Sequence, residues 1–228
     1  MTRVDTQLVE LSAETTSPVY ITGPDYFVPY VRDPAKHLFV HREAADGVPG
    51  VVELTEVGEL GRTDWTVDGF TLTGEFEYEE FEGEVSVPVE RVLAETPLTR
   101  EDFPLSFFKV VAVDPDQRSR GIGTQLTAKA IAPLFESPPV VAFIWLRDNP
   151  ANQRLAEYYA SGQVATFEDY FDEDWDCPDC GYENNCTCDV MVYGWFGDER
   201  DRAVAASNAG ADVEAETETE GGAGVASH

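Results

Sequence analysis

Basic residues, and lysine above all, are scarce in this chain of 228 residues. Only Lys36, Lys109 and Lys129 are lysines among the 15 basic residues, against 44 acidic residues and a net charge of −29. This balance excludes a nucleic-acid partner, because binding a phosphate backbone requires a basic face.

Long apolar runs are also lacking. No run reaches the length of a membrane span, and no apolar segment follows Met1. We therefore expect a cytoplasmic protein that neither crosses nor binds a membrane. Apolar residues still make up 43% of the chain, which is enough to fill the core of one domain. Histidine is found only at positions 37, 41 and 228, so no Ser–His–Asp arrangement can be assembled.

The acidic residues are spread along most of the chain, which disfavours an acidic patch that binds one basic partner. The composition instead resembles the acid-rich, lysine-poor surface of halophilic proteins. At molar salt the Debye length is about 3 Å, so self-repulsion that loosens the fold in dilute buffer is screened.

The strongest indication of function in the sequence is one turn between a predicted strand and a predicted helix. Residues 107–113 form a short apolar run typical of a buried strand. After the turn, Ile122, Leu126 and Ala130 have the spacing of an amphipathic helix. A glycine-bearing turn at the start of a helix offers free backbone N–H groups to a phosphate.

Arg118, Gly121 and Gly123 give this turn an R-x-x-G-x-G pattern, which resembles the motif of the GNAT superfamily of N-acyltransferases. The resemblance implies an α/β fold with a central mixed sheet flanked by helices. It implies acetyl-CoA as cosubstrate, with its pantetheine arm along the strand and its pyrophosphate in the turn. The residues so assigned are Val111, Ala112 and Val113 for pantetheine, and Arg118, Ser119, Arg120, Gly121, Ile122, Gly123 and Thr124 for pyrophosphate.

A second strand and helix follow in the order that the family requires. Residues 139–146 are apolar, and residues 151–161 follow Asn149 and Pro150, which suit a helix start. In the family, an asparagine and a tyrosine lie in this helix, and the tyrosine protonates the CoA thiolate. Asn152 and Tyr159 match that spacing, whereas Tyr158 fits better when counted back from Gly162.

Acidic residues become rarer where the cofactor is expected. Residues 107–160 carry six basic and five acidic side chains, a net charge of +1, so the remaining 174 residues carry −30. This local change supports an anion site independently of the motif.

Residues 1–100 give the least information about secondary structure and function. They contain predicted β segments at 50–55, 65–72 and 74–81, a possible edge strand at 84–90, and one weak helix at 33–43. The family usually begins with a strand and two helices that shape the acceptor pocket, so the acceptor stays open. For the general base, Glu77, Glu79, Asp102 and a water chain are equal alternatives.

All four cysteines lie between the predicted strands at 164–167 and 190–196. Cys177 and Cys180 form a C-x-x-C-G pair, and Cys186 and Cys188 form a C-x-C pair. In a reducing cytoplasm, four thiolates favour a structural zinc knuckle, with reactive or redox thiols as the alternative.

The sequence thus divides into a β-rich half at 1–100, an acyl-CoA-binding core at 101–196 with the knuckle at 177–188, and an acidic tail at 197–228 that we expect to be disordered. The predicted function is transfer of an acetyl group from acetyl-CoA to an acceptor amine, on a small molecule or a protein. The alternative is a non-catalytic module that binds acyl-CoA or a protein partner.

We expect the melting temperature to rise steeply between roughly 0.1 and 3 M KCl, as the Debye length falls from about 10 Å to under about 3 Å. Thermal melts across this series measure the effect. A flat profile would mean that the acidity serves a binding partner instead.

Overall fold

A mixed β-sheet forms the centre of the computed structural model, which describes residues 2–44, 47–136, 139–145, 150–159, 162–171, 176–177, 180–181 and 186–197. Within these residues the sheet has seven strands in the order β2-β1-β3-β4-β5-β7-β6, and only β4 and β5 are parallel neighbours. The strands are β1 (Lys36–Ala44), β2 (Pro49–Glu53), β3 (Trp65–Phe76), β4 (Leu105–Val113), β5 (Val140–Trp145), β6 (Gly162–Phe167) and β7 (Val190–Trp195).

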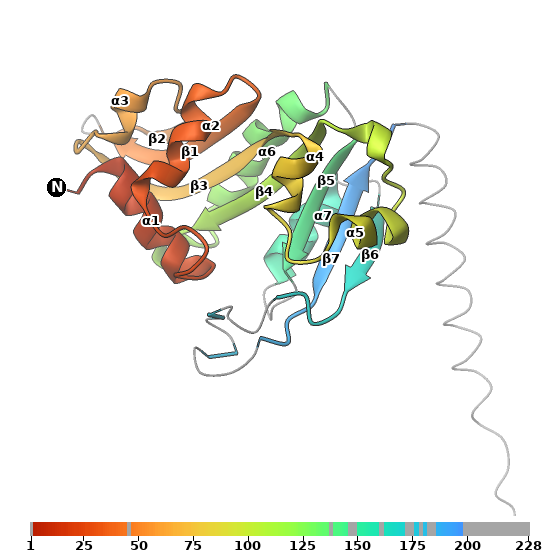
Figure 1. Cartoon of the computed structure of the whole chain (residues 1–228). Coiled ribbons are helices and arrows are strands. Elements are labelled where there is room, and N and C mark those ends of the chain that lie inside the picture. The colour runs from red at the N-terminus through yellow and green to blue at the C-terminus, as the bar shows by residue number, and fades with distance from the viewer. Residues whose placement is uncertain are drawn as a thin grey trace, which may run out of the picture.

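Helices cover both faces of this sheet. In Figure 1, α1, α2, α4 and α5 lie in front of the sheet and α6 lies behind it. The helices are α1 (Val4–Thr15), α2 (Val28–Arg32), α3 (Val57–Leu60), α4 (Tyr78–Glu82), α5 (Val89–Glu95), α6 (Ile122–Leu134) and α7 (Pro150–Tyr159). The predicted α/β class, a mixed sheet flanked by helices, is confirmed. No helix among the described residues is long and apolar enough to cross a membrane.

Two apolar cores lie on the two faces of the sheet. Neighbouring residues of β4 contribute to different cores, because side chains alternate along a strand. Phe107 packs with Phe76 and Phe81 on the α1 side, while Phe108 packs with Leu126 on the α6 side. Strand β4 is therefore buried on both faces, which explains its continuous apolar sequence.

The weak helix predicted at 33–43 is wrong, since β1 occupies most of it. Leu38 and Val40 are buried in the core on the α1 side, and Phe39 is buried in the core on the α6 side. Strand β1 pairs with β2 on one edge and β3 on the other, so its apolar residues face both layers. The Nδ1 atom of His37 lies 2.7 Å from a Glu53 carboxylate oxygen, and that of His41 lies 2.9 Å from an Asp68 carboxylate oxygen.

Three other segments of the first hundred residues differ from prediction. Helix α1 was not anticipated, although Val4, Leu8 and Leu11 have helical spacing and are buried. Strand β3 ends at Phe76, because a capping box starting at Glu77 begins α4. The predicted edge strand at 84–90 is absent among the described residues, and α5 begins there directly after Pro88.

Gly69 allows three elements to meet at β3. A Cβ atom at this position would lie 2.8 Å from the Ala112 carbonyl oxygen, 3.1 Å from Leu126 Cδ1 and 3.2 Å from Ile122 Cγ2. Strands β3 and β4 and helix α6 therefore approach one another closely at Gly69, which has no side chain.

We expect Gly69→Ala to lower the free energy of unfolding by about 1–3 kcal/mol, the usual cost of overpacking a core. Gly50→Ala in β2 is the matched control, because a Cβ atom there would meet nothing within 4 Å. Its effect should stay within about 0.5 kcal/mol. Denaturant unfolding in molar KCl measures both, and equal values would contradict close packing at Gly69.

Candidate active site

Strands β4 and β5 pair over only a short distance. Within the described residues, the parallel pairing joins residues 106–108 of β4 to residues 140–142 of β5. Strand β4 continues to Val113 and β5 to Trp145, so the two strands separate after this point. One edge of β4 from Lys109 onward is thus available to hydrogen-bond an extended ligand.

A cavity of about 1000 Å³ occupies this separation. It is lined by residues 107–113 of β4, by the turn and first residues of α6, and by residues of α7. Residues from the α1 side of the sheet also line it, because the separated strands leave a passage between the two faces. The volume is at the upper end of the range for small-molecule sites.

The turn before α6 has the conformation of an anion site. Ser119 and Gly121 have φ values of 64° and 79°, in the left-handed region. The first helical hydrogen bond runs from the Gln125 N–H to the Gly121 carbonyl at 3.0 Å. The N–H groups of Ile122, Gly123 and Thr124 precede it and have no partner inside the helix. They lie at the positive end of the α6 dipole, beside the cavity.

The structure brings most of the predicted cofactor residues to the cavity. Those that line it are Val111, Ala112, Val113, Arg118, Ser119, Gly121, Ile122, Gly123 and Thr124. Arg120 does not line it, and its guanidinium donates to the Gln117 side chain instead. Asn152 belongs to α7, but its side chain lies outside the described part of the chain.

Both candidate tyrosines of α7 line the cavity but differ in exposure. Tyr158 is 79% exposed, whereas Tyr159 is half-buried. The Tyr159 carbonyl accepts a hydrogen bond from the Trp195 indole N–H, which holds the end of α7 against β7. Burial raises the pKa of Tyr159, with the neighbouring Tyr158 as a second cause. A phenol in this state is protonated at neutral pH.

A buried ion pair lies at the other end of the cavity lining. The register of β3 and β4 passes from Leu72 opposite Val110 to Thr73 opposite Phe108, so Lys109 is the extra residue of a β-bulge. The Lys109 ammonium group pairs with the Glu84 carboxylate, and both residues line the cavity.

Three tyrosine rings surround the Lys109 ammonium group. Its nitrogen lies 4.8 Å from the ring centre of Tyr26, 5.6 Å from that of Tyr20 and 5.8 Å from that of Tyr30. Burial lowers the pKa of Lys109, and the nearby Glu84 opposes this effect. Cation–π contacts and the ion pair together compensate for the buried charge.

The acetyltransferase (GNAT) family model matches residues 6–162, which is more than half of the chain. The chain belongs to the GNAT family. The matched region contains the glycine turn before α6, both strands that separate, and helix α7. No curated protein matches this GNAT chain significantly.

Solved structures of similar fold include other acetyltransferases, all distant in sequence. The ribosomal-protein-S18-alanine N-acetyltransferase of Escherichia coli is 12% identical, covers 83% of this chain and 85% of its own, and has a TM-score of 0.45. A ribosomal-protein-alanine N-acetyltransferase of Brucella melitensis is 20% identical, with 66% and 70% covered and a TM-score of 0.37. A Salmonella typhimurium protein assigned as an acetyltransferase, with its cofactor acetyl-CoA, is 16% identical, with 67% and 66% covered and a TM-score of 0.38.

None of the three suggested general bases of this GNAT protein lines the cavity. Glu77 accepts in the capping box of α4, and Asp102 accepts a hydrogen bond from the Thr99 N–H at 2.7 Å. Glu79 is exposed on α4. The carboxylate that does line the cavity, Glu84, was missed because its neighbours suggested a strand. The sequence did contain an indication of this site, because its partner Lys109 is a single lysine inside an apolar run and needs a buried partner.

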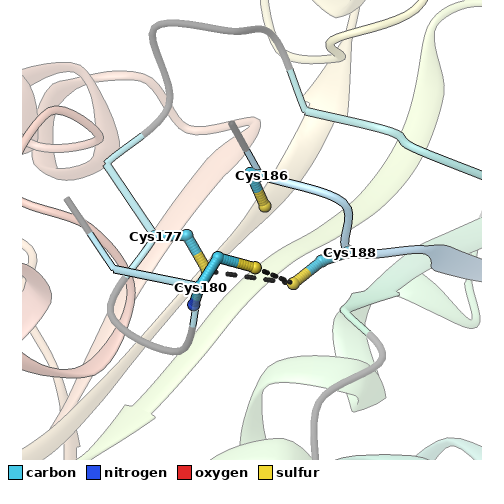
Figure 2. Close-up of side chains that lie close together, drawn as sticks. All are labelled: Cys177, Cys180, Cys186 and Cys188. Atoms are coloured by element: carbon cyan, nitrogen blue, oxygen red, sulfur yellow. Dashed lines mark hydrogen bonds between the residues drawn. The ribbon is translucent and has the colours of Figure 1, made fainter. Parts of the chain in front are cut away.

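The four cysteines form a tight cluster in the β6–β7 connection. Their sulfur atoms lie within 4.8 Å of one another and point toward a common centre (Figure 2). The Cys188 sulfur is 3.8 Å from that of Cys177 and 3.6 Å from that of Cys180, and no disulfide is formed. Four thiolates bound to one zinc ion at about 2.3 Å have sulfur atoms about 3.8 Å apart, so the donor set fits tetrahedral zinc.

Proposed function

We propose that this protein transfers an acetyl group from acetyl-CoA to an acceptor amine. The observation that carries the proposal is the single cavity lining shared by the phosphate-binding turn, the free edge of β4 and the α7 tyrosines. The pyrophosphate would bind the N–H groups at the start of α6, with Arg118 nearby. The pantetheine arm would extend along residues 111–113.

The reaction then needs few protein groups. The amine nitrogen forms a bond to the acyl carbon and the carbon–sulfur bond breaks. N–H groups of β4 around residues 111–113 stabilise the negative charge that develops on the carbonyl oxygen. One proton leaves the nitrogen and one reaches the departing sulfur, so the reaction of a neutral amine conserves charge. We assign the proton donor as Tyr159, because its phenol is shielded and protonated, whereas Tyr158 is largely exposed.

Acetyl-CoA calorimetry in molar KCl tests the binding site. Gly121→Val should reduce affinity at least tenfold, about 1.4 kcal/mol, by placing a branched side chain where the phosphate approaches. Arg118→Ala should cost less, because the backbone donors remain. Gly47→Val is the matched control, since Gly47 also has a positive φ, 73°, with open space around it, but lies outside the cavity lining.

Thiol release with a panel of primary amines tests the chemistry. Tyr159→Phe should retain acetyl-CoA affinity and lower turnover roughly 100-fold, a usual loss for a general acid. Tyr158→Phe should remain close to wild type. Equal, weak binding of acetyl-CoA by wild type and Gly121→Val would refute the acyltransferase. Tight binding without turnover on any amine would favour the non-catalytic module.

We further propose that Cys177, Cys180, Cys186 and Cys188 hold one structural zinc ion in a reducing cytoplasm. The sulfur spacing supports this assignment, as does the Cys180 N–H, which donates to the Cys177 sulfur at 3.3 Å. A closed set of four thiolates leaves no open position for a substrate, so the ion would organise the β6–β7 connection.

Metal analysis of protein purified without added zinc should give about one equivalent per chain. Cys180→Ser should release the metal and increase hydrogen exchange where Phe167 pairs with Val190, while acetyl-CoA affinity stays unchanged. Adding zinc back to wild-type protein stripped by a chelator should restore protection. Metal-free protein with four freely titrating thiols would contradict the assignment.

A further inference from the structure

The lining of the cavity on the α1 side differs from the rest in chemistry. We call the set Tyr20, Glu84, Ser86, Lys109, Tyr170 and Phe171 the acceptor end. These residues come from four separate parts of the chain, and Tyr20, Tyr170 and Phe171 pack in the core on the sheet face opposite α6. The Ser86 N–H donates to the Tyr170 hydroxyl at 3.0 Å, which joins two of these parts.

Glu84 is the charge that a ligand meets at this end. Its side chain is 23% exposed, whereas that of Lys109 is 1% exposed. Among the described residues, Glu84 is also the only carboxylate that lines the cavity, in a chain with 44 acidic residues. Lys109 holds one oxygen of this carboxylate, and the other oxygen can accept hydrogen bonds from one ammonium group of a ligand.

Lys109 holds this carboxylate in place. As the extra residue of the β4 bulge, it points to the same face as Val110, toward α1 and α2. The bulge itself is anchored, since the Thr71 hydroxyl donates to the Val110 carbonyl at 2.7 Å and the Thr73 hydroxyl donates to the Phe107 carbonyl at 3.0 Å. The ammonium group among the tyrosine rings is therefore a preorganised partner for one oxygen of Glu84.

The surroundings of Glu84 are aromatic or weakly polar. Tyr20, Tyr170 and Phe171 contribute aromatic surface to the lining, which suits an apolar body beside an ammonium group. A polyamine or a basic peptide would bring further positive charges that no described carboxylate of the cavity meets.

We propose that the acceptor end binds a primary monoamine whose remaining body is apolar or aromatic. Glu84 pairs with the ammonium form of the acceptor as it binds, and this group loses one proton to solvent before the neutral amine attacks. Lys109 is a positioning residue that orients Glu84. This assignment rests on the proposed acetyltransferase function, because it names the class of amine that the same cavity takes.

Calorimetry on CoA-saturated protein in molar KCl provides the test, with 2-phenylethylamine, 2-phenylethanol and spermidine as probes. 2-Phenylethylamine should bind at least tenfold more tightly than either other probe. Absence of 2-phenylethylamine binding would overturn the assignment, and so would equal or tighter binding of spermidine. Acetyl-CoA affinity is measured separately, so a failure of the cofactor site is recognised independently of the acceptor end.

Substitutions at Glu84 and Lys109 then test the role of each residue in amine binding. Glu84→Gln should weaken 2-phenylethylamine binding at least tenfold, and the exposed neighbour Glu82→Gln should leave it unchanged. Lys109→Met should weaken it as well, and Lys109→Arg should restore most of the affinity, which a purely space-filling role would not produce.

All these variants should keep the acetyl-CoA affinity of the wild type, which reports a folded cavity. If Glu84→Gln does not fold, the double variant Glu84→Gln with Lys109→Met is used in its place, because it removes both charges of the pair. Unchanged amine affinity in either variant would overturn the role of Glu84.

Discussion

The separation of β4 from β5 is the constraint on which the site depends. In a continuous sheet the inner strands pair along their full length, but the parallel pairing of β4 with β5 stops at Phe108. The bulge at the next residue turns β4 away, and two threonine hydroxyls from β3 satisfy the carbonyl groups beside it. Backbone hydrogen-bonding capacity is thereby left for a ligand, and the opening connects both faces of the sheet. The start of α6, the α7 tyrosines and the ion pair of Lys109 with Glu84 all lie at this one opening.

The sequence was most predictive where function depends on consecutive residues. Strand β4, the turn at 118–121 and helix α6 follow one another directly, so short-range patterns were sufficient to choose nine residues that line one cavity. The N-terminal region was harder, because strand β1 is buried on both sides and its sequence does not alternate. Helix α4 interrupted an expected strand because glutamates that fit a β pattern form a capping box.

The acceptor end could not be predicted, for a physical reason. Ser86, which follows Glu84 closely, and Tyr170 are 84 positions apart in the chain, and they meet only through the packing of the β6–β7 connection against the α4–α5 loop. A bulge redirects Lys109, and bulges leave little signal in one sequence. Composition still carried partial information, since a lysine within an apolar strand requires a buried partner.

The carbonyl of Cys188 accepts a hydrogen bond from the Tyr170 N–H at 3.1 Å, and Tyr170 in turn supports the backbone at Ser86. The cysteine cluster is therefore linked through Cys188 to the wall of the cavity, although no cysteine among the described residues lines it. A change of length between the two cysteine pairs would leave this hydrogen bond intact as long as Cys188 keeps its position. A change of length between Cys188 and β7 would instead displace the wall, so substrate preference in relatives should diverge together with the spacing of this last cysteine from the strand that follows it.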